Sequence, residues 1–389
     1  MTKEKSFFIQ LITDHLTKSP TEPCGDMGWY EIFELAKLHQ VEGIVFYQCK
    51  TFIPEEMRGL FESAYYSTLY NYSARQYALK QILSSLEEKG IPCFLIKGLE
   101  VSLYYPRPAL RTMGDLDVVV HREDRPEVHK ILLACGFKNI SHLYDREWQY
   151  YKDSLEYELH DRLVYHEVVT QDEHEAFFNE CWKYVHNGKL DASFHFLFLI
   201  LHLRKHLLNE GVGFRQFIDV ALMAQNEGGL DWDWIKEKMK ELNLDVFSSV
   251  CFGFINNWFG IKIPIEPALL DNEFFALATE SIFANGVFGF NNADNSKNAA
   301  VNAARKAKWR KLAMFKQVGE YILPSYESLR NHEKYSYLKG KPFLLPFTWI
   351  HRLFRNRTQF KIAKKNIDMH LASDQVISRR DDYLRNWGL

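Results

Sequence analysis

Two aspartates, one residue apart, stand at the start of an apolar run. Asp115 and Asp117 flank Leu116, and residues 118–120 are all valine. In an extended strand, residues two positions apart point to the same face, so the two carboxylates would project together. Buried side by side, they would repel each other unless they bound a proton or shared a cation. Oxygen ligands at this spacing suit Mg²⁺, which bridges protein carboxylates to substrate phosphates. The sequence therefore predicts metal-assisted phosphate chemistry.

A predicted strand-to-helix turn lies upstream of the aspartates. Residues 91–96 form a short apolar run between Gly90 and Gly98, which favours a buried strand. Gly98 then begins a short helix that ends before Pro106. A turn of this kind presents backbone N–H groups to a phosphate. Lys97, at the turn itself, would add a positive charge.

A period-two pattern in residues 155–163 predicts a further strand. The apolar residues at 155, 157 and 159 share one face, whereas Glu156, Glu158 and His160 share the other. This polar face could add carboxylates to the site. His160 and Asp161 also match a metal-phosphohydrolase pair. That chemistry needs further His and Asp ligands on helices, and His160 lies in a strand pattern, so we rank it low.

A glycine turn, a helix and Gly-Asp-x-Asp on an apolar strand together resemble the polymerase-β-type nucleotidyltransferase superfamily. A longer pattern resembles a bacterial family of uncharacterised nucleotidyltransferases. That pattern comprises Lys97-Gly98, Tyr105-Pro106, Arg111-x-Met113-Gly114-Asp115-x-Asp117 and Gly136-Phe137. The resemblance extends to Ala36–Val41, to Phe214–Asp219 after His202 and His206, and to Leu345-Pro346. It covers most of the chain, and the core of residues 97–117 is its most specific part.

The resemblance implies a catalytic metal site. Asp115 and Asp117 would bind Mg²⁺ or Mn²⁺ together with a third carboxylate from a later strand. The family pattern places an acidic residue two positions before a His, which fits Glu158 and His160. Glu158 would also help to deprotonate the acceptor hydroxyl. Glu156 lies on the same face of the predicted strand and is the alternative third carboxylate.

The resemblance also implies a nucleotide site. An NTP, expected to be ATP, would lie against Lys97, Gly98, Gly114 and Arg215. The implied reaction moves a nucleoside monophosphate to an acceptor hydroxyl and releases pyrophosphate. The superfamily usually has Ser or Gly after the first glycine of the turn, where this chain has Leu99, so Lys97 would substitute as the phosphate contact. This departure supports a second hypothesis, an inactive nucleotide-binding or scaffold module on the same fold.

Two further pairs have the i, i+4 spacing of one helix face. His202 and His206 could ligate a metal, although a His pair beside an apolar helix more often has a structural role. Arg215 and Asp219 most plainly form an ion pair within one helix.

The composition is that of a globular protein. The 389 residues are 47% hydrophobic and 25% charged, with a net charge of −2 at pH 7, which argues against wholesale disorder, a fibrous repeat or a nucleic-acid coat. The six cysteines include no C-x-x-C pair, as expected of reduced thiols. The longest apolar stretch, residues 194–203, is shorter than the ~20 residues that span a bilayer. We therefore expect a cytoplasmic protein that does not enter a membrane.

The elements that would position these groups predict an α+β fold class. We expect a small mixed nucleotidyltransferase sheet with flanking helices, next to a larger helical C-terminal region. The predicted divisions are a helical segment at residues 1–78, the catalytic core at 79–170, a helical domain at 171–300 and a basic helical region at 301–389. The substrate cleft should lie between sheet and helices, since ligand sites often fall at domain interfaces.

The C-terminal region is basic. Residues 301–389 contain 19 Lys or Arg against 7 Asp or Glu. Two runs, interleaved with aromatic residues, hold Lys306, Lys308, Arg310, Lys311, Arg352, Arg355, Arg357, Lys361, Lys364 and Lys365. Such runs could track a polyanion such as RNA, but helices that cover the cleft and balance the acidic remainder are the favoured interpretation. The acceptor is left open among a small molecule, an RNA end and a protein side chain.

Overall fold

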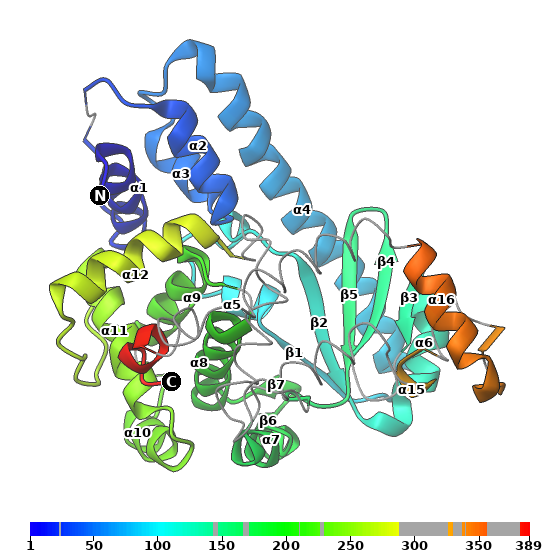
Figure 1. Cartoon of the computed structure of the whole chain (residues 1–389). Coiled ribbons are helices and arrows are strands. Elements are labelled where there is room, and N and C mark those ends of the chain that lie inside the picture. The colour runs from blue at the N-terminus through cyan, green and yellow to red at the C-terminus, as the bar shows by residue number, and fades with distance from the viewer. Residues whose placement is uncertain are drawn as a thin grey trace.

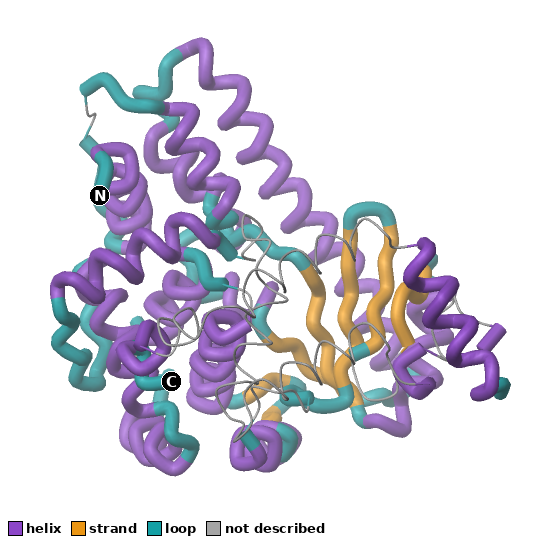
Figure 2. The backbone as a smooth tube through the Cα atoms, in the orientation of Figure 1, coloured by secondary structure: helices purple, strands orange, loops and turns teal. Residues whose placement is uncertain are grey.

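Five strands form the sheet that carries the candidate carboxylates, and helices surround it (Figure 1). The computed structural model describes residues 1–22, 25–142, 147–165, 171–209, 211–225, 229–287, 326–329, 337–338, 340–355 and 382–389. Within these residues the fold class is α+β, as the sequence predicts: a five-stranded mixed sheet and a two-stranded antiparallel sheet lie among many helices (Figure 2).

The helices and strands follow one another as labelled in Figure 1. The N-terminal helices are α1 (Lys3–Leu16), α2 (Trp29–Leu38), α3 (Glu42–Cys49) and α4 (Glu55–Glu88). The sheet region contains β1 (Cys93–Ile96), α5 (Gly98–Ser102), β2 (Asp115–Val120), α6 (Arg125–Ala134), β3 (Lys138–His142), β4 (Trp148–Lys152) and β5 (Leu155–His160). The following region contains α7 (Asp172–Phe178), β6 (Val185–His186), β7 (Lys189–Leu190), α8 (Ala192–Asn209), α9 (Phe214–Ala224), α10 (Trp232–Glu241), α11 (Asp245–Phe259) and α12 (Asn272–Asn285). Two later helices are α15 (Tyr326–Leu329) and α16 (Leu345–Arg355).

The strand order of the sheet places β2 beside β5. The order is β1-β2-β5-β4-β3, in which β2 and β5 run parallel and the other neighbours run antiparallel. In the register of the parallel pair, Asp115 lies opposite Glu156 and Asp117 lies opposite Glu158. Because side chains alternate along a strand, these four carboxylates share one face of the sheet.

The opposite face of the sheet is apolar and covered by helices. The β2 residues Leu116 and Val118 join one hydrophobic core with Ile82 of α4 and Val128 of α6. On the carboxylate face, Val119 belongs to a second, larger core that includes residues of α1, α8, α9 and α11. The alternation along β2 therefore places its apolar residues under α4 and α6 and turns its aspartates toward α8.

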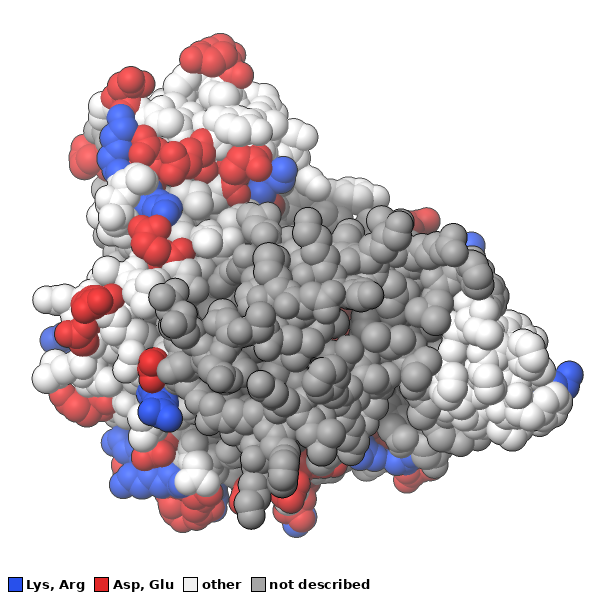
Figure 3. Space-filling view, viewed as in Figure 1, with Lys and Arg blue, Asp and Glu red and all other residues white. Residues whose placement is uncertain are grey.

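Most residues of the two predicted basic runs lie outside the described part of the chain. Residues 306–311 and 357–365 lie outside it, and residues 352 and 355 belong to α16. On the face drawn in Figure 3, groups of Asp and Glu side chains lie over α2 and the N-terminal end of α4. Among the helices of the described residues, none combines the length and the apolar character needed to cross a membrane.

One buried histidine in the larger core predicts how stability depends on pH. His39 is fully buried, packs against the Phe8 and Phe214 rings, and accepts a hydrogen bond at Nδ1 from the backbone N–H of Phe214 (3.3 Å). Burial lowers the pKa of His39 to about 3. An unfolded histidine binds a proton below pH ~6.5, whereas folded His39 does not, so acid favours the unfolded state.

As the pH falls from about 6 to about 4, we therefore expect the titration of His39 to lower the free energy of unfolding by about 1.4 kcal/mol for each pH unit. The His39→Phe variant should lose that part of the slope. Urea unfolding of both proteins across this range would measure it. Equal slopes for variant and wild type would contradict this prediction.

Candidate active site

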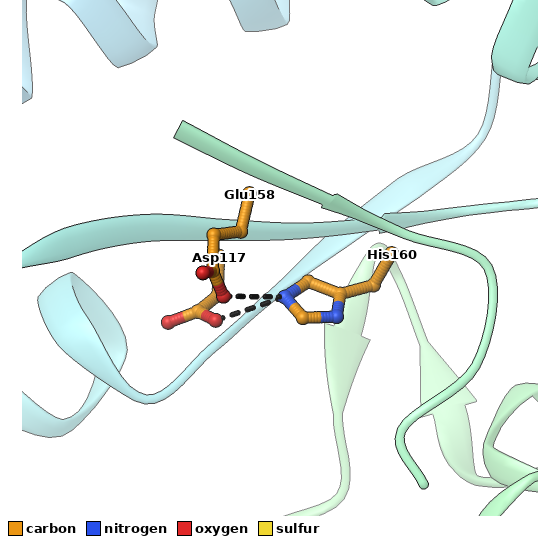
Figure 4. A group of neighbouring side chains, drawn as sticks. All are labelled: Asp117, Glu158 and His160. Carbon is orange, nitrogen blue, oxygen red and sulfur yellow. Dashed lines mark hydrogen bonds and ion pairs between the residues drawn. The ribbon is translucent and has the colours of Figure 1, made fainter. Parts of the chain in front are cut away.

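Three side chains from β2 and β5 converge at one point of the sheet (Figure 4). The Nε2 atom of His160 lies 2.9 Å from Oδ1 of Asp117 and 3.4 Å from Oε2 of Glu158. One ligand atom from each of the three residues lies within 4.8 Å of the others. The parallel register of the two strands produces this convergence, because it sets Asp117 beside Glu158 and leaves His160 one pleat further along.

Lys97 supplies a cation to the same cluster. Its Nζ atom donates to Oδ1 of Asp117 at 2.7 Å. Lys97 lies between β1 and α5 with φ +52° and ψ −131°, a backbone conformation that costs free energy for any residue other than glycine. Backbone strain at this position is consistent with a functional role for the side chain, because strain of this kind concentrates at active sites.

Neighbouring charges and hydrogen bonds in the cluster shift the pKa values of its members. Burial alone would raise the pKa of Asp117, but the Lys97 ammonium and the hydrogen bond from His160 outweigh it and hold the pKa below its usual range. Burial opposes the charge of His160, but hydrogen bonds to Asp117 and Glu158 raise its pKa to about 9. Burial and the nearby Asp117 charge raise the pKa of Asp115 to about 6. At neutral pH, Asp117 is therefore ionised in a buried site.

The donor set at this point fits a divalent cation. The second carboxylate oxygen of Asp117, Oδ2, is buried and has no hydrogen-bond partner within the described structure, and a buried carboxylate oxygen is normally satisfied. Two carboxylates and one imidazole are ligand types that bind divalent metals. Asp115 lies outside this group of converging ligand atoms, but it lines one cavity together with Glu158 and His160.

The two alternative third carboxylates have different surroundings. Glu158 accepts a hydrogen bond from Nε2 of Gln149 on β4 (3.2 Å) and lies beside Asp117. Glu156 lies opposite Asp115, and burial together with the Glu158 charge raises its pKa. Of the two, Glu158 is the one placed to share a cation with Asp117.

A buried ion pair links the Lys97–Gly98 turn to α9. Arg111 donates from Nε and an Nη atom to the two oxygens of Asp219, both at 2.8 Å, and Tyr105 donates to Asp219 Oδ1 at 2.6 Å. Arg111 also donates to the backbone carbonyl of Gly98 at 3.1 Å. Asp219 thus holds the segment before Asp115 and the Lys97–Gly98 turn against the helical region.

The remaining predicted nucleotide-site residues lie nearby. The backbone carbonyl of Gly114 accepts a hydrogen bond from Arg75 at 2.8 Å. Arg215 donates to the side chain of Gln40 and, at 3.1 Å, to the backbone carbonyl of Thr112.

A cavity of about 380 Å³ joins these groups. From the sheet side it is lined by Lys97, Gly98, Gly114, Asp115, Glu156, Glu158 and His160. Residues of α8 and α9, among them Lys205 and Arg215, line it as well. A cleft between sheet and helices is what the sequence predicts.

Two features of the site are not predicted by the sequence. The first is the meeting of His160 with Asp117 and Glu158, since the sequence indicates a ligand role for His160 only in the low-ranked pair with Asp161. The second is the Arg111–Asp219 pair, whose members are 108 residues apart. Both residues belong to motifs that the resemblance includes, and nothing in their local spacing indicates that they meet.

A family match defines the class of protein. A mixed sheet with carboxylates paired across β2 and β5 is the arrangement that the nucleotidyltransferase resemblance predicts. A family model described as uncharacterised nucleotidyltransferase matches residues 25–260. The chain belongs to this family, and the matched range contains every predicted site residue.

The chain was also compared with solved structures and with curated proteins. The chain is similar to a structure described as the solution structure of the antibiotic-resistance factor ANT(2'')-Ia, at 12% sequence identity and a TM-score of 0.32. That match covers 44% of this chain and 94% of the other. None of the curated proteins matches the sequence.

Proposed function

We propose that the protein is a metal-dependent nucleotidyltransferase that transfers a nucleoside monophosphate from an NTP, expected to be ATP, to an acceptor hydroxyl. Family membership supports the reaction class. The observation that carries the proposal is the unpartnered oxygen of Asp117 beside Glu158 and His160. A buried, ionised carboxylate oxygen without a hydrogen-bond partner would be stabilised by a bound cation, and this supports a metal site here.

Asp117, Glu158 and Asp115 would hold Mg²⁺ or Mn²⁺, with His160 as a further donor or as the partner that orients the two carboxylates. When bound, such a cation neutralises charge on the phosphate oxygens. The acceptor oxygen would form a bond to the α-phosphorus while the bond to the β-phosphate oxygen breaks, so that pyrophosphate leaves. The hydroxyl proton would pass to the carboxylate of Glu158.

The two glutamates on β5 provide an internal comparison. We expect Glu158→Gln to slow nucleotidyl transfer by about 100-fold or more, because it removes a charge beside Asp117 and the proton acceptor. Glu156→Gln, two residues away on the same strand face, should leave the rate nearly unchanged. Release of pyrophosphate from each NTP, with Mg²⁺ and pooled acceptors, measures both.

The opposite ranking would make Glu156 the third carboxylate. Equal and small effects of the two substitutions would remove the third carboxylate from the proposal. The acceptor is still open among small molecules, RNA ends and protein side chains, so the assay needs a pool of each.

A further inference from the structure

At the Lys97–Gly98 turn, both donor groups of Lys97 are already engaged. The Lys97 ammonium donates to Asp117 at 2.7 Å. The backbone N–H of Lys97 donates to Nε2 of His195 on α8 at 3.0 Å. A nucleotide triphosphate carries several negative charges, and in this arrangement most of them would need other partners.

The hydrogen bond to His195 also fixes where α8 lies relative to the carboxylates. His202 follows His195 by seven residues, which is two helical turns, so it lies on the same helix face about 10 Å further along. His202, Lys205 and His206 all line the cavity that contains Asp115 and Glu158. Three nitrogen-bearing side chains of α8 therefore share one cavity with carboxylates of β2 and β5.

The electrostatics around these side chains disfavour a metal. The Nε2 atoms of His202 and His206 lie 2.9 Å apart, a spacing that two imidazole ligands of one ion could adopt. However, burial and the positive charges nearby, including Lys97, Lys205 and Arg215, hold the pKa of His202 well below its usual value. Burial is the largest cause of this shift and opposes charge of either sign, but the positive charges of Lys97, Lys205 and Arg215 oppose a divalent cation and attract an anion.

The cavity therefore has two different electrostatic sides. Carboxylates on β2 and β5 contribute negative charge, whereas α8 and α9 contribute the positive charges of Lys205 and Arg215 and two imidazoles that can donate hydrogen bonds. We propose that His202, Lys205 and His206 on α8, together with Arg215, bind the β- and γ-phosphates of the nucleotide, the part that leaves as pyrophosphate. This inference rests on the proposed function, and it names a polyphosphate subsite on α8 in addition to the turn at Lys97 and Gly98.

The subsite can be tested without catalysis. Calorimetric titration of the protein with inorganic pyrophosphate and with tripolyphosphate, in the absence of divalent metal, should detect binding to wild type. Lys205→Gln and His206→Asn should each weaken that binding by about tenfold or more, since hydrogen bonds to charged groups contribute this much. Lys205→Arg, which keeps the charge, should retain most of the affinity.

Lys236→Gln is the matched control. Lys236 is an exposed residue of α10 with a loose ion pair to Asp233 (3.6 Å) and does not line the cavity, so the variant should bind both anions like wild type. Thermal melting of every variant shows whether the fold is kept. Absence of anion binding to wild type, or equal affinities for wild type and the α8 variants, would overturn the inference.

The nucleotidyl transfer assay separates this inference from the proposed function. Suppose that wild type catalyses transfer and the α8 substitutions do not change its affinity for the anions. This result would disprove the subsite but would still support the reaction. Anion binding that depends on Lys205 and His206, in a protein that transfers nothing, would support the subsite and disprove the reaction.

Discussion

Replacing Asp117 with asparagine is expected to slow nucleotidyl transfer by about 1,000-fold or more. Asparagine keeps the shape of the side chain but removes the negative charge that Lys97 and His160 now share. The loss of a carboxylate that holds a catalytic cation removes several kcal/mol of transition-state stabilisation, and about 4 kcal/mol corresponds to a factor of 1,000. Pyrophosphate release at saturating NTP and Mg²⁺ measures the effect.

The control for Asp117→Asn is Asp233→Asn, the same change at an exposed position on α10. That variant should react at the wild-type rate. A folded Asp117→Asn protein that retains a tenth or more of the wild-type activity would show that the cluster on β2 and β5 is not the catalytic centre.

The second large effect concerns stability. We expect Asp219→Ala to lower the free energy of unfolding by about 3–5 kcal/mol, because it leaves the buried guanidinium of Arg111 without its carboxylate. Asp219 and Arg111 are both buried, and the pair joins through two hydrogen bonds of 2.8 Å. Urea unfolding followed by tryptophan fluorescence would measure the loss.

A double variant separates the effect of losing the Arg111–Asp219 ion pair from the effect of losing side-chain packing. Arg111→Met with Asp219→Leu removes both charges, so it should unfold closer to wild type than Asp219→Ala does. It should still lose activity, because Arg111 also holds the Gly98 carbonyl. An Asp219→Ala protein within about 1 kcal/mol of wild type would contradict a structural role for this ion pair.

Local patterns predict the strands that carry the candidate carboxylates and the direction of their polar faces, but not β3, β6 or β7. The i, i+2 spacing of Asp115 and Asp117 before an apolar run, and the alternation along residues 155–160, predict a face for Asp117 and a face for Glu158. The structure has both segments as strands. The fold class also follows, since short apolar strands between long amphipathic helices leave few other architectures. The assignment of individual residues to catalysis stays a prediction.

The arrangement between distant segments could not be predicted in this way. Nothing in residues 155–160 indicates that this strand lies parallel to β2 rather than at an edge, yet that neighbour sets Glu158 beside Asp117. Likewise, the bonds from Lys97 to His195 and from Arg111 to Asp219 link residues about one hundred positions apart. Such contacts depend on how the sheet and helices pack, which spacing along the chain does not encode.

The most direct test of the central claim follows the two ends of the triphosphate separately. The 389-residue chain would be incubated with Mg²⁺ and with ATP labelled at either the α- or the γ-phosphate, in the presence of pooled small molecules, RNA and proteins. We predict that the α-label appears on an acceptor, that the γ-label appears only in pyrophosphate, and that the Asp115→Ala/Asp117→Ala double variant does neither. Magnesium-dependent ATP binding with no α-label on any acceptor, or equal labelling by the double variant, would contradict the account; the former result would favour a nucleotide-binding module without turnover.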